Sequence, residues 1–327
     1  MQKQWPFRHK WCWIGNYVLP AHLLGRGRTI VPSMRRPEIS PQRFRIVVWT
    51  AFGSLYAIIV TGSLVRLTGS GLGCSDWPNC NSTKFVDVST GHAAIEQVNR
   101  LFTGVVAASV IVAVSSSVFL KPRSRKITAN AAFLVLGVLV QVILGAYVVL
   151  TGLNPWSNMA HFLVSIMLVT ASFVLVKRVE SVIAPASAAE CEDRWPRWCL
   201  IAAASAVLLL GTVVTGAGPH SGAEQATRLG ISVKHATQMH SFAVWVMVFL
   251  AVLVTFRARK NSARWVHEGP LMLRLLAALC AQGFIGYVQY FAGVPAPLVA
   301  VHVALSVTVW LCALAVFLPA STLLVLD

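Results

Sequence analysis

Long apolar runs follow one another along most of the chain and are separated by short polar segments. A helix needs about 20 apolar residues to cross the hydrocarbon core of a bilayer. Eight runs are near this length, at residues 46–66, 93–120, 128–151, 158–177, 198–217, 236–256, 271–292 and 298–322. The pattern therefore predicts an all-α integral membrane protein with eight transmembrane helices.

The second half of this pattern repeats the first at an offset of 141 residues. Gln141, Gly145, Gly152 and His161 return as Gln282, Gly286, Gly293 and His302. Self-similarity at so long a period is typical of membrane proteins built from two related bundles. We therefore expect two pseudo-symmetric four-helix bundles, in residues 46–180 and 198–327, joined by a cytoplasmic linker at 181–197. The same offset aligns Asn99 with His240, so the two halves carry different residues at this position.

Composition and charge support this interpretation. Hydrophobic residues make up 56% of the chain and charged residues 12%, whereas about a quarter of a soluble domain is charged. The net charge of +16 could suggest a nucleic-acid partner, but 22 of the 27 Lys and Arg fall on one side if the N-terminus is cytoplasmic. This asymmetry follows the positive-inside rule. We therefore expect a multi-pass protein of the cell membrane, with both termini cytoplasmic, a lipid environment and no nucleic acid.

Residues 1–45 form a basic segment that we expect to be cytoplasmic. The segment has no apolar run long enough for a signal peptide or a span. Met34, followed by Arg35 and Arg36 just before the first run, is a candidate for the true start of the protein.

A Gly-rich loop after the first run carries Cys74 and Cys80. The loop is expected on the outer side of the membrane, where an oxidising environment allows disulfides. Zinc would need two further ligands, and the Cys-x-x-Cys-His pattern of covalent c-type haem is absent. The pair is therefore predicted to form a disulfide, of either structural or redox function.

A polar cluster opens the second run. Glu96 is the only acidic residue that the pattern places inside a span, where a carboxylate is costly unless it is paired or faces a polar cavity. Helical spacing puts His92, Glu96, Asn99 and Arg100 on one face. Two interpretations follow: an ion pair between Glu96 and Arg100 at the interface, or the polar wall of a functional site.

Three histidines open even-numbered runs at similar predicted depth: His161, His240 and His302. Imidazole is a common axial ligand of haem iron, and two His from facing helices of a four-helix bundle favour bis-His haem. We expect His240 and His302 to share one iron. The equivalents in the first half are Asn99 and His161. Because Asn is a poor ligand of haem iron, we expect the iron in that half to have an open or exchangeable coordination position.

From about Phe44 to its end the chain resembles the haem A synthase family, especially actinobacterial-like bacterial members. The resemblance rests on the segment TGSLVRLTGSGLGCSDWPNC at residues 61–80, on the Glu96-x-x-x-Arg100 element, and on the three histidines in a duplicated frame. Two features depart from the family pattern. Many members have His at the position of Asn99, and some have a second Cys pair between spans five and six.

The resemblance implies an oxidoreductase that converts haem O to haem A by oxidising a ring methyl to a formyl group. It implies a b-type haem on His240 and His302 that relays electrons, and substrate haem O in the N-terminal half. Substrate-binding residues would be His161, Asn99, Arg100, Arg66 and His92, with Arg66 and Arg100 near propionates. We expect Glu96 to take part in proton transfer, a haem O synthase to supply the substrate, and an unidentified electron acceptor, with quinone as a candidate.

Two other functions remain open at this point. The first is a b-type cytochrome that carries electrons to or from quinone through the same haem. The second is a haem transporter or chaperone in which the loop with Cys74 and Cys80 gates delivery.

Overall fold

The computed structural model describes residues 11–14, 17–20, 38–185 and 194–318, and the chain divides into the units Met1–Pro37 and Glu38–Asp327. In the first unit, β1 (Trp11–Ile14) and β2 (Tyr17–Pro20) pair in antiparallel fashion with Trp11 opposite Pro20. The apolar pattern did not predict this hairpin. Met34 lies outside the described residues.

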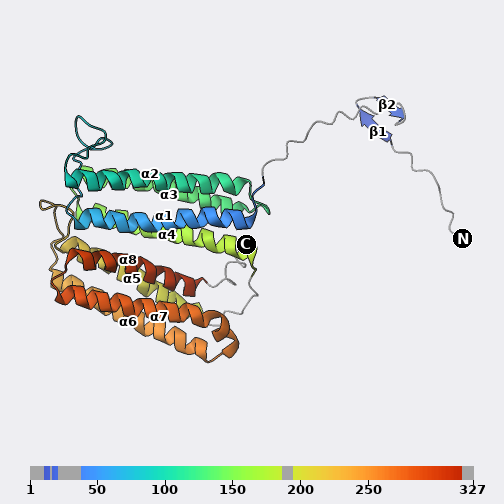
Figure 1. Ribbon diagram of the computed structural model, residues 1–327. Helices are drawn as coiled ribbons and strands as arrows, with labels where there is room; N and C mark the ends of the chain where they lie inside the picture. Colours follow the sequence, from blue (N-terminus) through green and yellow to red (C-terminus); the bar gives the residue numbers. More distant parts are fainter. Residues whose placement is uncertain (1–10, 15–16, 21–37, 186–193, 319–327) are drawn as a thin grey trace. The chain divides into compact units, whose positions relative to one another are not determined.

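The described part of the second unit is built from eight long helices (Figure 1): α1 Pro41–Leu67, α2 Gly91–Val118, α3 Arg125–Leu150, α4 Pro155–Ile183, α5 Arg194–Ala217, α6 Val233–Arg259, α7 Ser262–Phe291 and α8 Ala296–Phe317. Within the described residues, all eight are long and apolar enough to cross a membrane. The predicted all-α membrane fold is confirmed for this unit.

Polar caps and tight turns set the helix boundaries. Ser40 accepts a hydrogen bond from the backbone N–H of Arg43 at the start of α1, as N-cap residues do. The turns that end α3 and α7 share one backbone conformation, with φ of 63° and 61° at Gly152 and Leu153 and 78° and 61° at Gly293 and Val294. The sequence repeat therefore corresponds to a repeated local structure.

The helices pack within each half of the chain and along a seam between the halves. In the first half α1 packs on α2 and α4, and α3 packs on α4; in the second half α5 packs on α6 and α8, and α7 packs on α8. Helices α1 and α8 meet at the seam (Figure 1), where the Tyr56 hydroxyl donates to the Ala304 carbonyl at 2.9 Å and the Trp310 indole donates to Thr170 Oγ1 at 2.7 Å.

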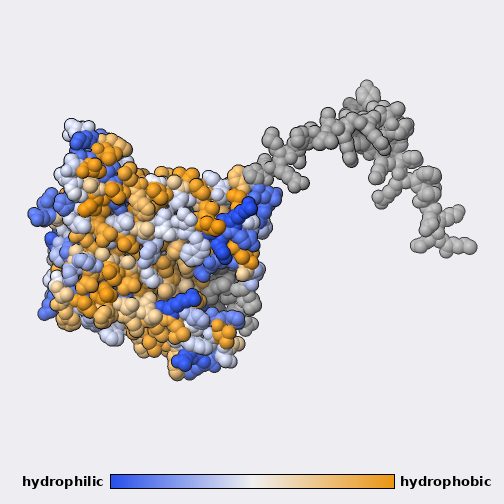
Figure 2. Space-filling model, in the orientation of Figure 1, coloured by the Kyte–Doolittle hydropathy of each residue, from blue (hydrophilic) through white to orange (hydrophobic). Residues whose placement is uncertain are grey.

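Apolar side chains dominate the helix surface. Figure 2 shows a broad hydrophobic area across the helices. Exposed apolar side chains of the helices include Ile143, Phe249 and Leu273. A water-soluble protein would bury most of these side chains, whereas lipid solvates them.

Helix α7 is longer than the apolar run that predicted it. Helix α7 begins at Ser262, nine residues before the predicted start at 271, so it contains Glu268. This carboxylate is 8% exposed and pairs with Arg197 of α5 at 2.5 Å and with Arg264 at 2.7 Å. Glu96 is therefore not the only acidic residue in a spanning helix, and the apolar pattern missed Glu268 because its polar neighbours resemble a loop.

Candidate functional site

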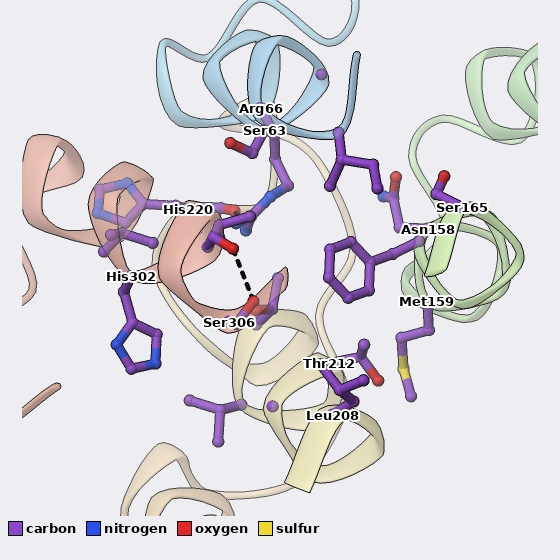
Figure 3. A pocket seen from close by; sticks show the side chains of 18 of the residues that line it. Ser63, Arg66, Asn158, Met159, Ser165, Leu208, Thr212, His220, His302 and Ser306 are labelled. Carbon is purple, nitrogen blue, oxygen red and sulfur yellow. Dashed lines mark hydrogen bonds between the residues drawn. The ribbon is translucent and has the colours of Figure 1, made fainter. Parts of the chain in front are cut away.

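A cavity of about 1520 Å³ lies among the helices and is lined by residues of both halves. His161, His240 and His302 all line it. Figure 3 shows part of this space, with Arg66 on α1, Asn158 and Met159 on α4, and His302 on α8. The structure therefore brings the three predicted histidines to one continuous cavity.

His240 and His302 face each other across the second half of the cavity. Their ring centroids are 6.5 Å apart. Because an imidazole nitrogen binds a metal at about 2 Å, two rings on opposite sides of one metal ion have centroids about 6.3 Å apart. His240 Nδ1 donates to the Val207 carbonyl at 3.1 Å, which leaves Nε2 as the unprotonated nitrogen. The spacing of the two rings and the hydrogen bond of His240 suit ligation of one metal, while His302 Nδ1 is buried without a hydrogen-bond partner among the described residues.

Glycines let the neighbouring helices approach these rings closely. A Cβ at Gly211 would lie 3.3 Å from His240 Cε1, and a Cβ at Gly286 would lie 3.2 Å from His302 Cε1. These distances are tight enough that any larger residue would press on the ring. The backbone carbonyl of His302 accepts a hydrogen bond from Gln282 Nε2 at 3.0 Å, which ties α7 to α8 at the same level.

The first half repeats this arrangement around His161. Gln141 Nε2 donates to the His161 carbonyl at 3.1 Å, and a Cβ at Gly145 would lie 3.5 Å from His161 Cε1. His161 Nδ1 is buried and has no hydrogen-bond partner. Asn99 also lines the cavity, and its Oδ1 accepts a hydrogen bond from Thr61 Oγ1 at 2.8 Å. The Gln and Gly of the repeat thus support a histidine in both halves.

Among the described residues, no group of three or more His, Cys, Asp or Glu is placed to hold a metal ion. The candidate ligands among the predicted residues are therefore a histidine pair, His240 and His302, and a single histidine, His161. Two axial imidazoles are sufficient for an iron whose other four positions are filled by a macrocycle.

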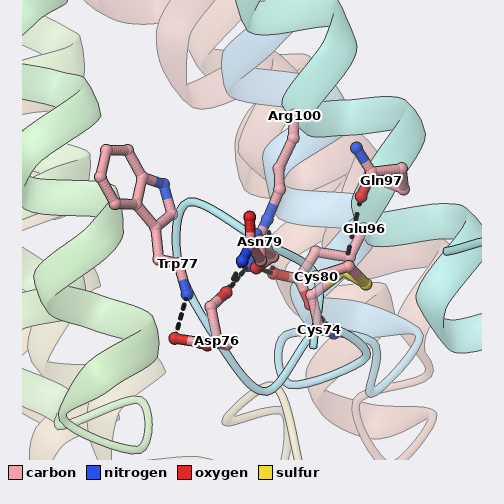
Figure 4. A network of polar contacts seen from close by, with 8 residues as sticks. All are labelled: Cys74, Asp76, Trp77, Asn79, Cys80, Glu96, Gln97 and Arg100. Carbon is pink, nitrogen blue, oxygen red and sulfur yellow. Dashed lines mark hydrogen bonds and ion pairs between the residues drawn. A yellow bond between two sulfur atoms is a disulfide. The ribbon is translucent and has the colours of Figure 1, made fainter. Parts of the chain in front are cut away.

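Cys74 and Cys80 form the predicted disulfide (Figure 4), in a loop that contributes Trp77 and Pro78 to the cavity lining. The loop is fastened to α2. The backbone N–H of Cys74 donates to Glu96 Oε2 at 2.7 Å, and Arg100 donates to Glu96 Oε1 at 2.6 Å and to the carbonyls of Asp76 and Asn79. Trp77, between the two cysteines, lines the cavity. The ion pair of Glu96 and Arg100 is therefore present and holds the loop, and both residues also line the cavity, so the two interpretations of this cluster are compatible.

Arg66 and Arg100, which were both expected near propionates, have different surroundings in the structure. Arg100 is paired with Glu96. Arg66 lines the cavity and donates to the His220 carbonyl, but within the described chain no carboxylate pairs with it. Arg66 is therefore a cation that remains available for an anionic group of a ligand, and Lys234 also lines the cavity.

The structure separates His92 from the other candidates. His92 Nδ1 lies 2.9 Å from Ser70 Oγ, the side chain is exposed, and it is not among the residues that line the cavity. The sequence interpretation missed His220, which lines the cavity and donates from Nε2 to the Val294 carbonyl at 2.8 Å. No periodic pattern marks His220, because it lies in the loop between α5 and α6.

Comparison with known proteins decides the family. A model of the cytochrome oxidase assembly protein family, COX15-CtaA, matches residues 45–93 and 85–314. The chain belongs to this family. It is a multi-pass membrane protein, as its eight apolar helices indicate.

Curated relatives share about a third of the aligned residues. The chain is 32% identical over 149 residues to the heme A synthase of Geobacillus kaustophilus, which is 45% of this chain and 46% of the relative. It is 30% identical to the heme A synthase of Geobacillus thermodenitrificans (41% and 42%) and 35% identical to that of Listeria welshimeri (39% and 43%). Each alignment covers less than half of the relative.

Arg100→Gln is expected to loosen the disulfide loop. The substitution leaves Glu96, which is 5% exposed, without its counter-charge, and breaking a buried pair in this way costs about 3 kcal/mol. Reduction of Cys74–Cys80 by a thiol reagent, followed by alkylation, should therefore be faster than in the wild type.

Lys84→Gln is the matched control. Lys84 pairs with Asp87 at 3.5 Å in the same segment between α1 and α2, but its side chain is 55% exposed, so the pair contributes little. Equal reduction rates in the two variants would show that Arg100 does not hold the loop.

Proposed function

We propose that the chain is a haem A synthase, an oxidoreductase that converts haem O to haem A within the membrane. The observation that carries the proposal is the His240–His302 pair, whose 6.5 Å spacing suits two axial ligands of one iron. Membership of the cytochrome oxidase assembly family and the names of the curated relatives support it.

In the proposal, the second half of the chain, residues 198–327, holds a b-type haem on His240 and His302. Such a bis-imidazole haem supplies one-electron transfer without taking up a further ligand. The Val207 carbonyl orients the His240 ring, and Gly211 and Gly286 leave room for both rings. Electrons would leave this half to an acceptor for which quinone is a candidate.

The first half, residues 46–180, is proposed to bind substrate haem O through His161. His161 has a buried, unpartnered Nδ1, and Gly145 and Gln141 flank it as their counterparts flank His302. Arg66 would pair with a propionate, because it is the cavity-lining Arg without a carboxylate partner in the described chain. Haem O is amphipathic, and a haem O synthase in the same membrane is the proposed source.

The proposed role of Glu96 changes from proton transfer to positioning. Both of its oxygens already accept hydrogen bonds, from Cys74 N–H and from Arg100. Protonation of Glu96 would break at least one of these bonds, so the geometry suits a carboxylate that fastens the loop. Glu96 would instead keep Trp77 and the disulfide loop over the substrate end of the cavity.

Mass analysis of extracted haem tests the proposal. Membranes from cells that express this chain with a haem O source should contain haem A or its hydroxylated intermediate, and membranes from cells with the haem O source alone should not. If only haem B and unmodified haem O are found, the electron carrier or the haem transporter becomes the better assignment.

A further inference from the structure

Asn99 stands where the repeat would place a second imidazole. We propose that Asn99 and the iron position opposite His161 form a binding site for a diatomic haem ligand, such as dioxygen or carbon monoxide. The inference rests on the proposed binding of haem by His161. It adds a ligand class, and it assigns Asn99 as the hydrogen-bond donor to that ligand.

The position of Asn99 follows from the repeat. His240 on α6 faces His302 on α8 with ring centroids 6.5 Å apart. The offset of 141 residues maps these residues onto Asn99 on α2 and His161 on α4. Asn99 and His161 both line the cavity. By the repeat, Asn99 takes the place relative to His161 that His240 takes relative to His302.

Asn99 lines the cavity and keeps a hydrogen-bond donor without a partner among the described residues. Its Oδ1 accepts a hydrogen bond from Thr61 Oγ1 at 2.8 Å. The amide nitrogen carries two N–H donors, and within the described chain no group accepts from it. With Oδ1 bonded to Thr61, the group of Asn99 that is left for a ligand is the amide NH2, which is a hydrogen-bond donor.

No other described side chain is placed to occupy the open position. His92 is bonded to Ser70 and does not line the cavity. His220 Nε2 is bonded to the Val294 carbonyl. Both oxygens of Glu96 are bonded to Cys74 and Arg100. Met159 lies on the same helix as His161 and so cannot bind iron from the opposing side.

An open iron position beside a polar donor has a specific chemical consequence. Ferrous haem with one imidazole ligand binds diatomic molecules in the vacant position, and donors near that position stabilise a ligand that takes on negative charge. A bis-imidazole haem has no vacant position. The two halves of the cavity would therefore differ: one transfers electrons and the other binds a diatomic ligand.

The test is a carbon monoxide difference spectrum of the full-length chain, purified with haem in both halves and reduced. Haem content is measured first in the wild type and in His161→Ala. The difference between the two is the haem that is bound in the first half. In the wild type, the haem that depends on His161 should bind carbon monoxide. Asn99→His should lose this signal while keeping its haem, because a second imidazole fills the position.

Vibrational spectra test the role of the amide separately. Asn99→Leu should still bind carbon monoxide, but the C–O stretch should move to higher wavenumber because the donor is lost. Thr61→Val should broaden the band by freeing the amide to rotate. Ser109→Ala is the matched control: it removes the 2.8 Å bond between Ser54 and Ser109 on the same two helices, away from the cavity lining, and should leave the band unchanged.

The outcomes separate the two proposals. If His161→Ala leaves the haem content unchanged, haem binding in the first half is wrong. If that haem is present but the wild type is six-coordinate and binds no carbon monoxide, the diatomic site is overturned while the synthase proposal stands. An unchanged C–O band in Asn99→Leu would overturn the donor role of Asn99.

Discussion

Replacing His161 by Ala is expected to abolish haem A formation and to remove the haem of the first half, while the haem of the second half stays bound. Among the described residues of α1, α2, α3 and α4, His161 is the one histidine that lines the cavity. Without it the substrate iron has no strong protein ligand, because Asn99 is a poor one. Extracted haem should then contain haem B but neither haem A nor its hydroxylated intermediate.

His235→Ala is a suitable control for this result. His235 is an exposed residue near the start of α6, bonded to Ser232 and not among the residues that line the cavity. It should retain both haems and haem A formation. Haem A at the wild-type level in His161→Ala would contradict the assignment of the substrate site to the first half.

Replacing His302 by Ala is expected to remove the b-type haem of the second half. The remaining ligand, His240, would hold the iron from one side only, so the low-spin spectrum of a bis-imidazole haem should be lost. Haem A formation should also stop, because electrons from the substrate site would have no relay. Electron paramagnetic resonance of the oxidised protein and haem quantification measure the two effects.

Added imidazole distinguishes loss of a ligand from loss of folding. The substitution leaves space where the His302 ring stood, and free imidazole can enter it and restore the low-spin signal of a folded protein. A misfolded protein would not recover. A low-spin spectrum in His302→Ala without added imidazole would show that His302 is not the ligand.

Much of the fold followed from the apolar pattern. Eight runs near bilayer length predicted eight helices, because a spanning segment must satisfy its backbone hydrogen bonds internally and expose apolar side chains to lipid. The pattern failed where polar residues are buried inside a helix. Glu268 lies in α7 and is neutralised by Arg197 from α5, and a partner 71 residues away leaves no periodic signal.

The candidate site was predicted in part. The histidines were found because a repeat marks His161 and His302 and because equivalent helices place equivalent residues at the same level. The disulfide was found because Cys74 and Cys80 are close in sequence. The ion pair of Arg100 with Glu96 was among the interpretations of the sequence, but the loop partners of the two arginines were not predictable. His220 from the α5–α6 loop bonds to Arg66, whereas Asp76 and Asn79 bond to Arg100.

The sequence by itself determined the number of membrane-spanning helices, the duplication and the identity of the histidines, because these depend on composition and period along the chain. Only the tertiary structure decided that the ring centroids of His240 and His302 are 6.5 Å apart, that Glu96 fastens a loop, and that His92 lies outside the cavity lining. The physical reason is that these features depend on contacts between segments far apart in sequence, whose geometry is set by helix packing and loop path.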